Sequence, residues 1–495
     1  MPRLSTRVRT HQSPSIALTK RRIPSRQSHI DLYLYGYYCM LLCFITSRSS
    51  TFTRAFLPHT FSGRVPYSST RKIALTPHIA MSLQQEQEQQ EETPPTHEKA
   101  KLIPSTHTSL SKAGKRLAEG NLVSFPTETV YGLGCHALDP QAIAKVFAAK
   151  ERPLTDPLIV HVTDSSATLN FWQAFESSKD NLEAQLLKLL TGHFWPGPLT
   201  IVAKANPSIP STLMANTGYV ACRSPRHVIA RELIEASGVP IAAPSANKFG
   251  HVSPTKASHV WDDLKEEDVW IVDPELDEDG DQATKDHGSC VCNVGVESTV
   301  AKIEMNSVSS GIVTILRHGA VSAKDLSICI SSNVKLQQTF TIQEKMQSTK
   351  EDVSHVAPGQ TIRHYSPNIL SYMISQCRYD CHHATSSLDS TLTHEERTQL
   401  SKAVIIDWGG RLNTLEPYAL AYRDVSSNDC STEAAASVFE TLRWSETVNG
   451  AERVYFPDIC VQEADQNEKE QEALVLAVKD RLTRAASGVI VDTFI

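Results

Sequence analysis

The 495-residue sequence lacks the features that mark several large classes of protein. Its eleven cysteines have no paired spacing. Because a chain of this length can bury a large core without disulfides, the cysteines indicate a reducing compartment rather than a disulfide-stabilised secreted protein. The apolar run over 32–45 is interrupted by Gly36 and by tyrosines, and it is short for a membrane span. We therefore expect no membrane partner.

The usual sequence motifs for nucleotide binding and for nucleophilic catalysis are also missing. There is no Walker A sequence and no set of kinase motifs, so any nucleotide would be bound in an unrelated way. No Cys–His or Ser–His–Asp arrangement is legible, although His161 and Ser245 stay open as a pair. The residues at 377–383 include two cysteines and two histidines without the paired spacing of zinc ligands. We therefore predict a surface turn there and no metal site.

Acidic residues are nearly absent from the first 80 positions. This stretch has twelve Lys/Arg and one acid, Asp31, so its balance is +11 and that of the remaining chain is −18, within a total of −7. A strongly acidic body is a poor match to a polynucleotide, whose binding depends on neutralising phosphates. We therefore expect any direct binding of RNA to be weak.

The N-terminal extension, 1–104, is predicted to be disordered. Its first 80 residues have the Arg- and Ser-rich, acid-poor composition of an organelle transit peptide, and a Gln/Glu tract ending in prolines follows at 82–98. A chain that starts at Met81 is the equally weighted alternative. We expect a cytoplasmic protein, or a mitochondrial or plastid one if the transit peptide is genuine.

Alternating apolar strands and helices predict an α/β domain over 105–330. The stretch 124–134 is interpreted as a strand end, a hydroxyl-rich turn and a glycine-containing loop before a helix that starts at Asp139-Pro140. An acidic stretch at 274–289 lacks the calcium-loop spacing and is predicted to be a solvated insertion. The other predicted strands are 157–162, 199–203, 219–222, 241–243, 269–272, 298–303 and 312–316, and the other helices are 110–117, 181–191 and 228–236.

A second, smaller α/β domain is predicted over 370–495, after a polar linker at 331–369. Its strands are expected at 403–407 and 454–456, and its helices at 433–444 and 473–485. The loop Trp408-Gly409-Gly410 fails the spacing of a dinucleotide fingerprint, so the ligand of this domain stays open.

Polar side chains gather where the predicted strands of the first domain end. They are mostly cations, hydroxyls and an amide, and this mixture describes a pocket for a polyanion, because Arg and Lys bind carboxylate and phosphate. Taken singly, most have simpler interpretations as solvated cations, core histidine or helix caps. From the residue types alone we therefore predict only an α/β enzyme that binds an anionic ligand. The set is Thr127, Lys150, Arg152, His161, Arg223, Ser245, Asn247, Ser253, Ser298 and Arg317.

Six motifs, in order, resemble the threonylcarbamoyl-AMP synthase family. They are FPTETVYGLG at 125–134, KERP at 150–153, PLIVH at 157–161, WPGPLT at 195–200, APSAN at 243–247 and GVEST at 295–299. The segment RHYSP at 363–367 and the second domain resemble the long form of that family. The resemblance implies a YrdC-like twisted mixed sheet with an open concave cleft, joined by an active-site-covering linker to a Rossmann-like domain.

The resemblance also implies an activity. The family makes L-threonylcarbamoyladenylate from L-threonine, bicarbonate and ATP, releases pyrophosphate, and supplies a tRNA threonylcarbamoyl-transferase complex that modifies position 37. ATP would be a substrate, with Mg2+ bound through the nucleotide, and direct tRNA binding would be weak. Two alternatives stay open: a double-stranded RNA-binding module without catalysis, and a carbamoyladenylate-forming carbamoyltransferase.

Matched motif by motif, the resemblance assigns roles to individual residues. The catalytic set around ATP and the reacting carboxylate is Lys150, Arg152, Ser245 and Asn247. Ser253, Arg317 and Tyr365 would add contacts to ATP. L-Threonine would be bound by Thr127, His161, Arg223, the Ala243 backbone and Ser298, with Glu128 and Thr129 bracing the loop. Tyr219 departs from the family, whose members often have Thr there, and no general base is assigned.

Overall fold

The structure is a computed structural model, and it describes residues 99–176, 181–276, 292–345, 364–375, 392–459, 469–492 and 494. The predicted transit peptide and Gln/Glu tract, the turn at 377–383 and most of the acidic insertion lie outside the described residues. The chain divides into two compact units, Met1–Glu92 and Thr93–Ile495, and the second unit contains both of the sheets. Within the described part, no helix is long and apolar enough to cross a membrane.

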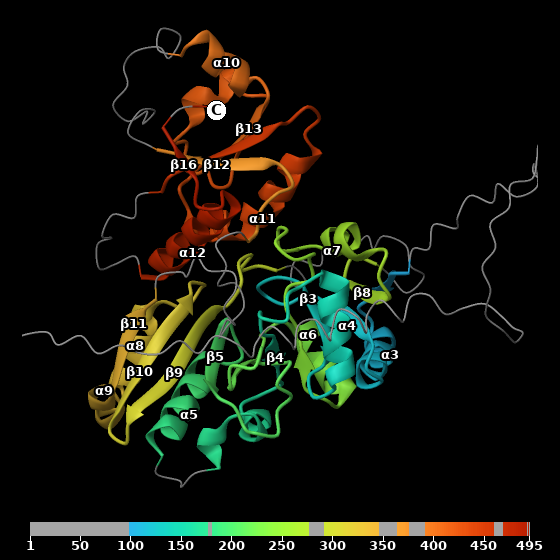
Figure 1. Cartoon of the computed structure of the whole chain (residues 1–495), viewed down its shortest axis with the longest axis vertical. Helices are drawn as coiled ribbons and strands as arrows, with labels where there is room; N and C mark the ends of the chain where they lie inside the picture. The colour runs from blue at the N-terminus through green and yellow to red at the C-terminus, as the bar shows by residue number, and fades with distance from the viewer. Residues whose placement is uncertain are drawn as a thin grey trace, which may run out of the picture. The chain divides into compact units, whose positions relative to one another are not determined.

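In the described residues, eleven strands form one mixed sheet in the order β1-β8-β2-β3-β7-β4-β6-β5-β9-β10-β11. Figure 1 shows β9, β10 and β11 as neighbours at one end of it. Strands β2 and β3 pair antiparallel, whereas β4 and β6 pair parallel, so several loops meet in the middle of the sheet. The bounds are β1 Lys101–Pro104, β2 Leu122–Phe125, β3 Gly132–His136, β4 Ile159–His161, β5 Leu199–Lys204, β6 Tyr219–Arg223, β7 Ile241–Ala242, β8 Val269–Asp273, β9 Thr299–Ser307, β10 Ser310–Arg317 and β11 Phe340–Glu344.

Helices cover both faces of this sheet because its strands are apolar on both sides. Helices α3 (His107–Ala118) and α6 (Val228–Ser237) pack on one face with Val123 and Phe125 of β2, whereas Leu122 joins the cluster on the other face. That second cluster contains α4 (Pro140–Lys150), α5 (Leu182–Phe194), α7 (Ala257–Leu264), α8 (Ala323–Ser331) and α9 (Val334–Thr339). Short 3₁₀ turns occupy Ser166–Asn170 and Gln173–Phe175.

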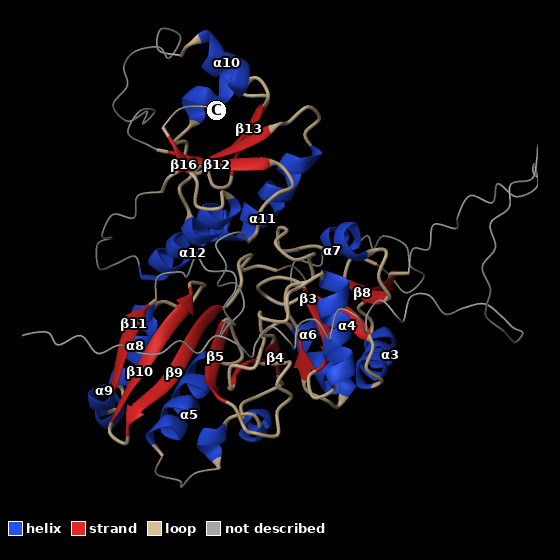
Figure 2. Cartoon of the chain, in the orientation of Figure 1, coloured by secondary structure: helices blue, strands red, loops and turns tan. Residues whose placement is uncertain are grey.

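We call the second sheet with its helices the C-terminal domain. Its described strands are all parallel, in the order β14-β13-β15-β12-β16. Figure 2 shows β12 and β13 with α11 and α12 of this domain. Val404 and Ile406 of β13 pack with α11 and α12, whereas Ala403 and Ile405 face the side of α10, the alternation expected of a buried strand. The bounds are β12 Leu370–Ile374, α10 His394–Leu400, β13 Ala403–Asp407, a 3₁₀ turn at Asn413–Tyr418, β14 Ala421–Asp424, α11 Ser431–Thr447, β15 Arg453–Pro457, α12 Lys469–Ala485 and β16 Ile490–Val491.

The expected α/β architecture is confirmed, but three local predictions are wrong. The N-terminal extension was predicted to be disordered up to residue 104, whereas Lys101–Pro104 forms β1 and pairs in parallel with β8. The stretch 124–134 was predicted to end in a loop, but residues 132–134 belong to strand β3, which pairs with β2. The glycines permit this close pairing, because a Cβ at Gly134 would lie 2.8 Å from the Phe125 ring. The predicted linker also starts too early, since β11 at Phe340–Glu344 pairs with β10 in the large sheet.

Candidate active site

A small cavity lies where the middle strands of the large sheet end. Its volume is about 40 Å³, and His364 and Tyr365 form part of its wall. Nine of the twelve predicted site residues line it: Thr127, Arg152, His161, Arg223, Ala243, Ser245, Ser298, Arg317 and Tyr365. The structure therefore brings together residues that lie far apart in the sequence.

The Thr127 turn presents hydroxyls to one side of the cavity. Thr127 Oγ1 donates to the Val130 carbonyl at 2.7 Å and accepts the Thr129 backbone N–H at 3.2 Å. Ser298 Oγ lies 2.7 Å from Thr200 Oγ1, and both side chains are buried. These bonds fix the hydroxyl positions before any ligand enters, which reduces the entropy that binding would otherwise cost.

His161 adds a neutral imidazole to the same side. Burial and the neighbouring Arg223 lower the pKa of His161 to about 3, so the ring is uncharged near pH 7. Its Nδ1 atom lies 3.2 Å from the Ile159 carbonyl, which can only accept a hydrogen bond. Nδ1 therefore carries the proton, and Nε2 is left as an acceptor in a residue that lines the cavity.

Arg223 is held by an ion pair within the protein. Its Nη2 lies 2.6 Å from Glu128 Oε1, and Nη1 donates to Thr129 Oγ1 at 2.8 Å. Burial alone would raise the pKa of Glu128, but Arg223 outweighs it and the pKa is lowered. Glu128 also accepts the Arg226 backbone N–H at 3.1 Å. Glu128 and Thr129 thus brace the loop, as the sequence suggested.

Two buried guanidinium groups occupy another part of the cavity wall. Arg152 pairs with Asp156 at 2.8 Å and donates to the Pro157 carbonyl at 2.9 Å. Arg317 donates to the Ser298 carbonyl at 3.1 Å and to its Oγ at 3.2 Å. Burial lowers the pKa of both arginines, although an arginine stays charged at neutral pH. The two cations make this region favourable for an anion.

Tyr365 contributes a hydroxyl that is buried and has no hydrogen-bond partner among the described residues. Its ring centroid lies 5.3 Å from the Arg481 guanidinium, in the range of a cation–π contact. The backbone at Tyr365 has a φ of 62°, a left-handed conformation that side-chain-bearing residues seldom adopt. A buried hydroxyl beside cations is a ready contact for a ligand.

Lys150, Asn247 and Ser253 do not line the cavity, but Lys150 and Ser253 bond to residues that do, Ser245 and Glu297. Lys150 Nζ donates to the carbonyls of Ser245, at 2.6 Å, and Asn247, and burial lowers its pKa well below the usual value. Ser253 Oγ donates to Glu297 Oε1 at 2.5 Å. Lys150 thus supports the wall that Ser245 forms.

The end of α4 explains how Lys150 and Arg152 reach this place. The helix starts with Asp139 as its N-cap and Pro140 in its first turn, and it ends at Lys150, with Glu151 as the C-cap at a φ of 54°. This left-handed residue turns the chain between the two cations. Lys150 consequently points toward the Ser245 backbone, and Arg152 lies in the cavity wall.

Sequence reasoning missed several residues that complete the site. Asp156 neutralises Arg152, and the acidic partner of Ser253 is Glu297. Arg443 and Arg481, from the C-terminal domain, contact Asp263 and Glu297 respectively. Asp156 is four residues from Arg152, a spacing that could have suggested the pair, whereas the two arginines gave no comparable signal.

The fold and this site define an α/β enzyme whose cavity combines hydroxyls and a neutral histidine with buried cations. Residues 115–319 match the family described as "Telomere recombination", and residues 321–487 match the family described as "Threonylcarbamoyl-AMP synthase, C-terminal domain". Similar curated proteins are the threonylcarbamoyl-AMP synthases of Pyrococcus abyssi, 32% identical over 75% of this chain and 92% of the relative, and of Bacillus subtilis, 31% identical over 77% and 94%.

A solved structure of P. abyssi Sua5 in complex with L-threonine has a similar fold. Its TM-score is 0.59 at 27% identity, and the match covers 79% of this chain and 98% of that one. The chain belongs to the threonylcarbamoyl-AMP synthase family. The resemblance seen in the six sequence motifs is thereby confirmed.

Proposed function

We propose that this chain condenses L-threonine, bicarbonate and ATP to L-threonylcarbamoyladenylate and pyrophosphate, for the threonylcarbamoyl modification of tRNA position 37. Family membership supports the activity, and the P. abyssi complex with L-threonine supports the amino acid. The observation that carries the assignment is the cavity itself, where hydroxyls and a neutral imidazole lie in the same wall as two buried guanidinium groups.

Threonine is proposed to bind at the side formed by Thr127, His161 and Ser298. The free Nε2 of His161 would accept the substrate hydroxyl, and Arg223 would bind the carboxylate while it keeps Glu128 as a second partner. A site that hydrogen-bonds a substrate hydroxyl rejects analogues without it far better than an apolar pocket does. The Ala243 backbone forms the adjoining wall.

ATP is proposed to place its phosphates against Arg152 and Arg317, with Tyr365 as a further contact. Of the described residues that line the cavity, Glu297 alone is acidic, and it is engaged by Arg481. Mg2+ would therefore be held by the phosphates, where it supplies charge neutralisation as they are displaced. His364 and Tyr365 line the same cavity, so this segment would contact the bound nucleotide.

The proposed chemistry has two bond-forming steps. The threonine amine attacks the carbon of bicarbonate, or of CO2 derived from it, and water is lost overall to leave an N-carboxylate. An oxygen of this carboxylate attacks the α-phosphorus of ATP, the Pα–O bond to the β-phosphate breaks, and pyrophosphate leaves. Because an anion attacks a polyanion, Arg152 and Arg317 contribute by lowering the electrostatic barrier.

The adenylate is proposed to pass to the tRNA threonylcarbamoyl-transferase complex, with little direct binding of tRNA to this chain. A cytoplasmic location is proposed on the composition of the sequence, with a mitochondrial or plastid location as the alternative if residues 1–80 are a genuine transit peptide.

ATP–pyrophosphate exchange tests the proposal. We expect exchange that requires both L-threonine and bicarbonate and that falls sharply in Arg152→Ala. Exchange that needs carbamoyl phosphate instead would favour the carbamoyltransferase. Salt-dependent binding of double-stranded RNA without any exchange would favour the RNA-binding module.

A further inference from the structure

The loop at 247–253 joins two residues assigned to the ATP side, Asn247 and Ser253. It is held internally by the Asn247 amide, which donates to the His251 carbonyl at 2.9 Å. It is also held from α4, because the Phe249 N–H donates to the Lys150 carbonyl at 2.8 Å. These contacts fix the inner edge of the loop against the cavity wall.

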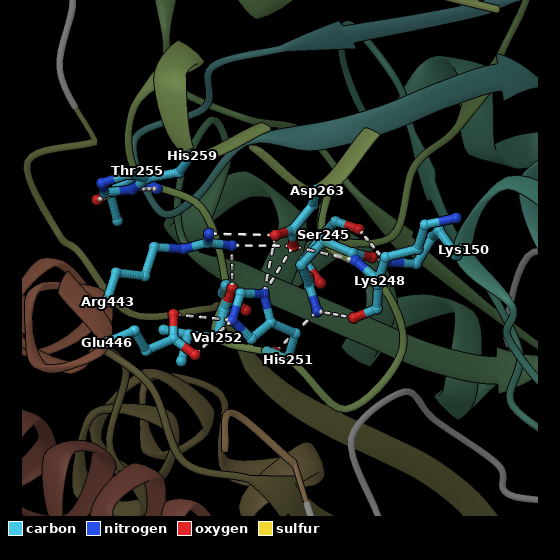
Figure 3. Close-up of polar contacts among 12 residues, drawn as sticks. Lys150, Ser245, Lys248, His251, Val252, Thr255, His259, Asp263, Arg443 and Glu446 are labelled. Carbon is cyan, nitrogen blue, oxygen red and sulfur yellow. Dashed lines mark hydrogen bonds and ion pairs between the residues drawn. The ribbon is translucent and has the colours of Figure 1, made fainter. Parts of the chain in front are cut away.

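The outer edge of the loop is held by Arg443 of α11, in the C-terminal domain (Figure 3). Arg443 Nη2 donates to the Val252 carbonyl at 2.5 Å, directly before Ser253, and to Asp263 Oδ2 at 3.0 Å. Asp263 in turn accepts the Lys248 N–H at 3.1 Å. Arg443 and Asp263 thus hold both ends of the loop, and Arg443 is only 6% exposed.

His251, within the same loop, extends this cluster. Its Nδ1 lies 2.9 Å from Asp263 and its Nε2 lies 3.0 Å from Glu446. Figure 3 shows the ring between these two carboxylates. Burial alone would lower the pKa of His251, but the two carboxylates raise it to about 9. Two cations, Arg443 and protonated His251, therefore balance the charges of Asp263 and Glu446, and loss of one member leaves a buried charge unpaired.

Arg481 of α12 acts on Ser253 by a second, indirect route, through Glu297. Its fully buried guanidinium donates to Glu297 Oε2 at 3.0 Å and to the His318 carbonyl at 2.7 Å. The other carboxylate oxygen of Glu297 accepts the Ser253 hydroxyl. Arg443 therefore fixes the backbone before Ser253, and Arg481 fixes the group that orients its side chain.

We propose that Arg443 and Arg481 are positioning residues of the nucleotide site, through which the C-terminal domain sets the place of Asn247 and Ser253. The inference rests on the proposed function, because it takes these two residues to serve ATP. Neither arginine is a catalytic residue in this account. Each acts through a carbonyl or carboxylate beside Ser253, on a loop or helix next to the large sheet, so its loss should affect ATP far more than threonine.

Steady-state kinetics of ATP–pyrophosphate exchange by the full chain provide the test. Small displacements of a binding group cost on the order of ten- to a hundredfold, so we expect Arg443→Ala to raise the KM for ATP by about that factor. The KM for threonine should change less than about twofold, since within the described residues Thr127, His161 and Arg223 make no hydrogen bond or ion pair to the C-terminal domain. Arg481→Ala should also raise the KM for ATP.

The matched control is Lys256→Ala. Lys256 forms a 2.8 Å ion pair with Glu440 of α11, so it crosses to the same helix, but it makes no bond to loop 247–253. We expect this variant to keep both KM values, and melting temperatures report whether each variant is folded. If Arg443→Ala is insoluble, Arg443→Lys, which keeps the charge without the fork, should show the same ATP-specific rise.

An unchanged KM for ATP in a folded Arg443 variant, or an equal rise in both KM values, would overturn the positioning role. Absence of exchange in the unmodified chain would instead overturn the proposed function, so the two failures can be told apart.

Discussion

Substitution of Glu128 should change the stability of the protein and its binding of threonine in opposite directions. Glu128 forms a 2.6 Å ion pair with Arg223, and the two side chains are 6% and 5% exposed. Glu128→Gln keeps the shape but removes the counter-charge, and breaking a buried pair in this way costs about 3 kcal/mol of unfolding free energy. With about 2.1 cal/mol/K of unfolding entropy per residue over the roughly 400 residues of the second unit, the melting temperature should fall by about 3–4 °C.

The same substitution should strengthen threonine binding. Arg223 would no longer be shared with Glu128, and the repulsion between the Glu128 and substrate carboxylates would disappear. That repulsion is on the order of 1–2 kcal/mol at the effective dielectric of a protein site, so the Kd for L-threonine should fall about five- to thirtyfold. Because the pKa of Glu128 is lowered by folding, the stability difference should be full above about pH 4.5 and shrink below it.

Thermal melts and calorimetric titration with L-threonine measure the two effects. Thr129→Val is the matched control, because it removes the 2.8 Å hydrogen bond to Arg223 without changing a charge. It should cost about 1 kcal/mol and give no tighter Kd. A Glu128→Gln variant that melts like the unmodified chain, or that binds threonine more weakly, would refute the reasoning.

Three further predictions concern other parts of the site. Lys150→Ala should lower exchange activity about a hundredfold, because it removes the hydrogen bond that holds the Ser245 backbone. The control variant Lys145→Ala, on the same helix, should keep its activity. Full activity in Lys150→Ala would show that Lys150 has no role in the site. Thr127→Val should reduce the kcat/KM preference for threonine over 2-aminobutyrate by about tenfold or more, as measured in competition; an unchanged preference would contradict the hydroxyl-reading role. The stability advantage of the unmodified chain over His251→Gln should be full below about pH 6.5 and be lost as the pH rises through about 9, because folding raises the pKa of His251; pH-dependent melts that show a constant difference would oppose this.

Much of the site could be predicted because its residues lie at strand ends. The apolar run at 403–407 coincides with β13, and the run at 157–162 contains β4, whose last residue is His161. Continuous apolar stretches locate buried strands well, and polar residues directly after them converge at one edge of a sheet. Nine predicted residues accordingly share one cavity.

The remaining features depend on contacts that no local pattern records. Strand β11 was assigned to the linker because Phe340–Glu344 is short and half polar, and only its pairing with β10 reveals it as an edge strand. Arg481 and Glu297 are 184 positions apart, and their ion pair has no periodicity in the sequence. The role of the C-terminal domain at the nucleotide site therefore required the structure.

Product analysis with two labels tests the central claim most directly. The purified chain would be incubated with ATP, 14C-bicarbonate and 3H-threonine, and the AMP-containing product would be separated from pyrophosphate. We predict one adenylate that carries both labels in equal amounts, with one pyrophosphate released for each. An adenylate that carries threonine without the bicarbonate carbon, or cleavage of ATP that needs neither substrate, would contradict the account.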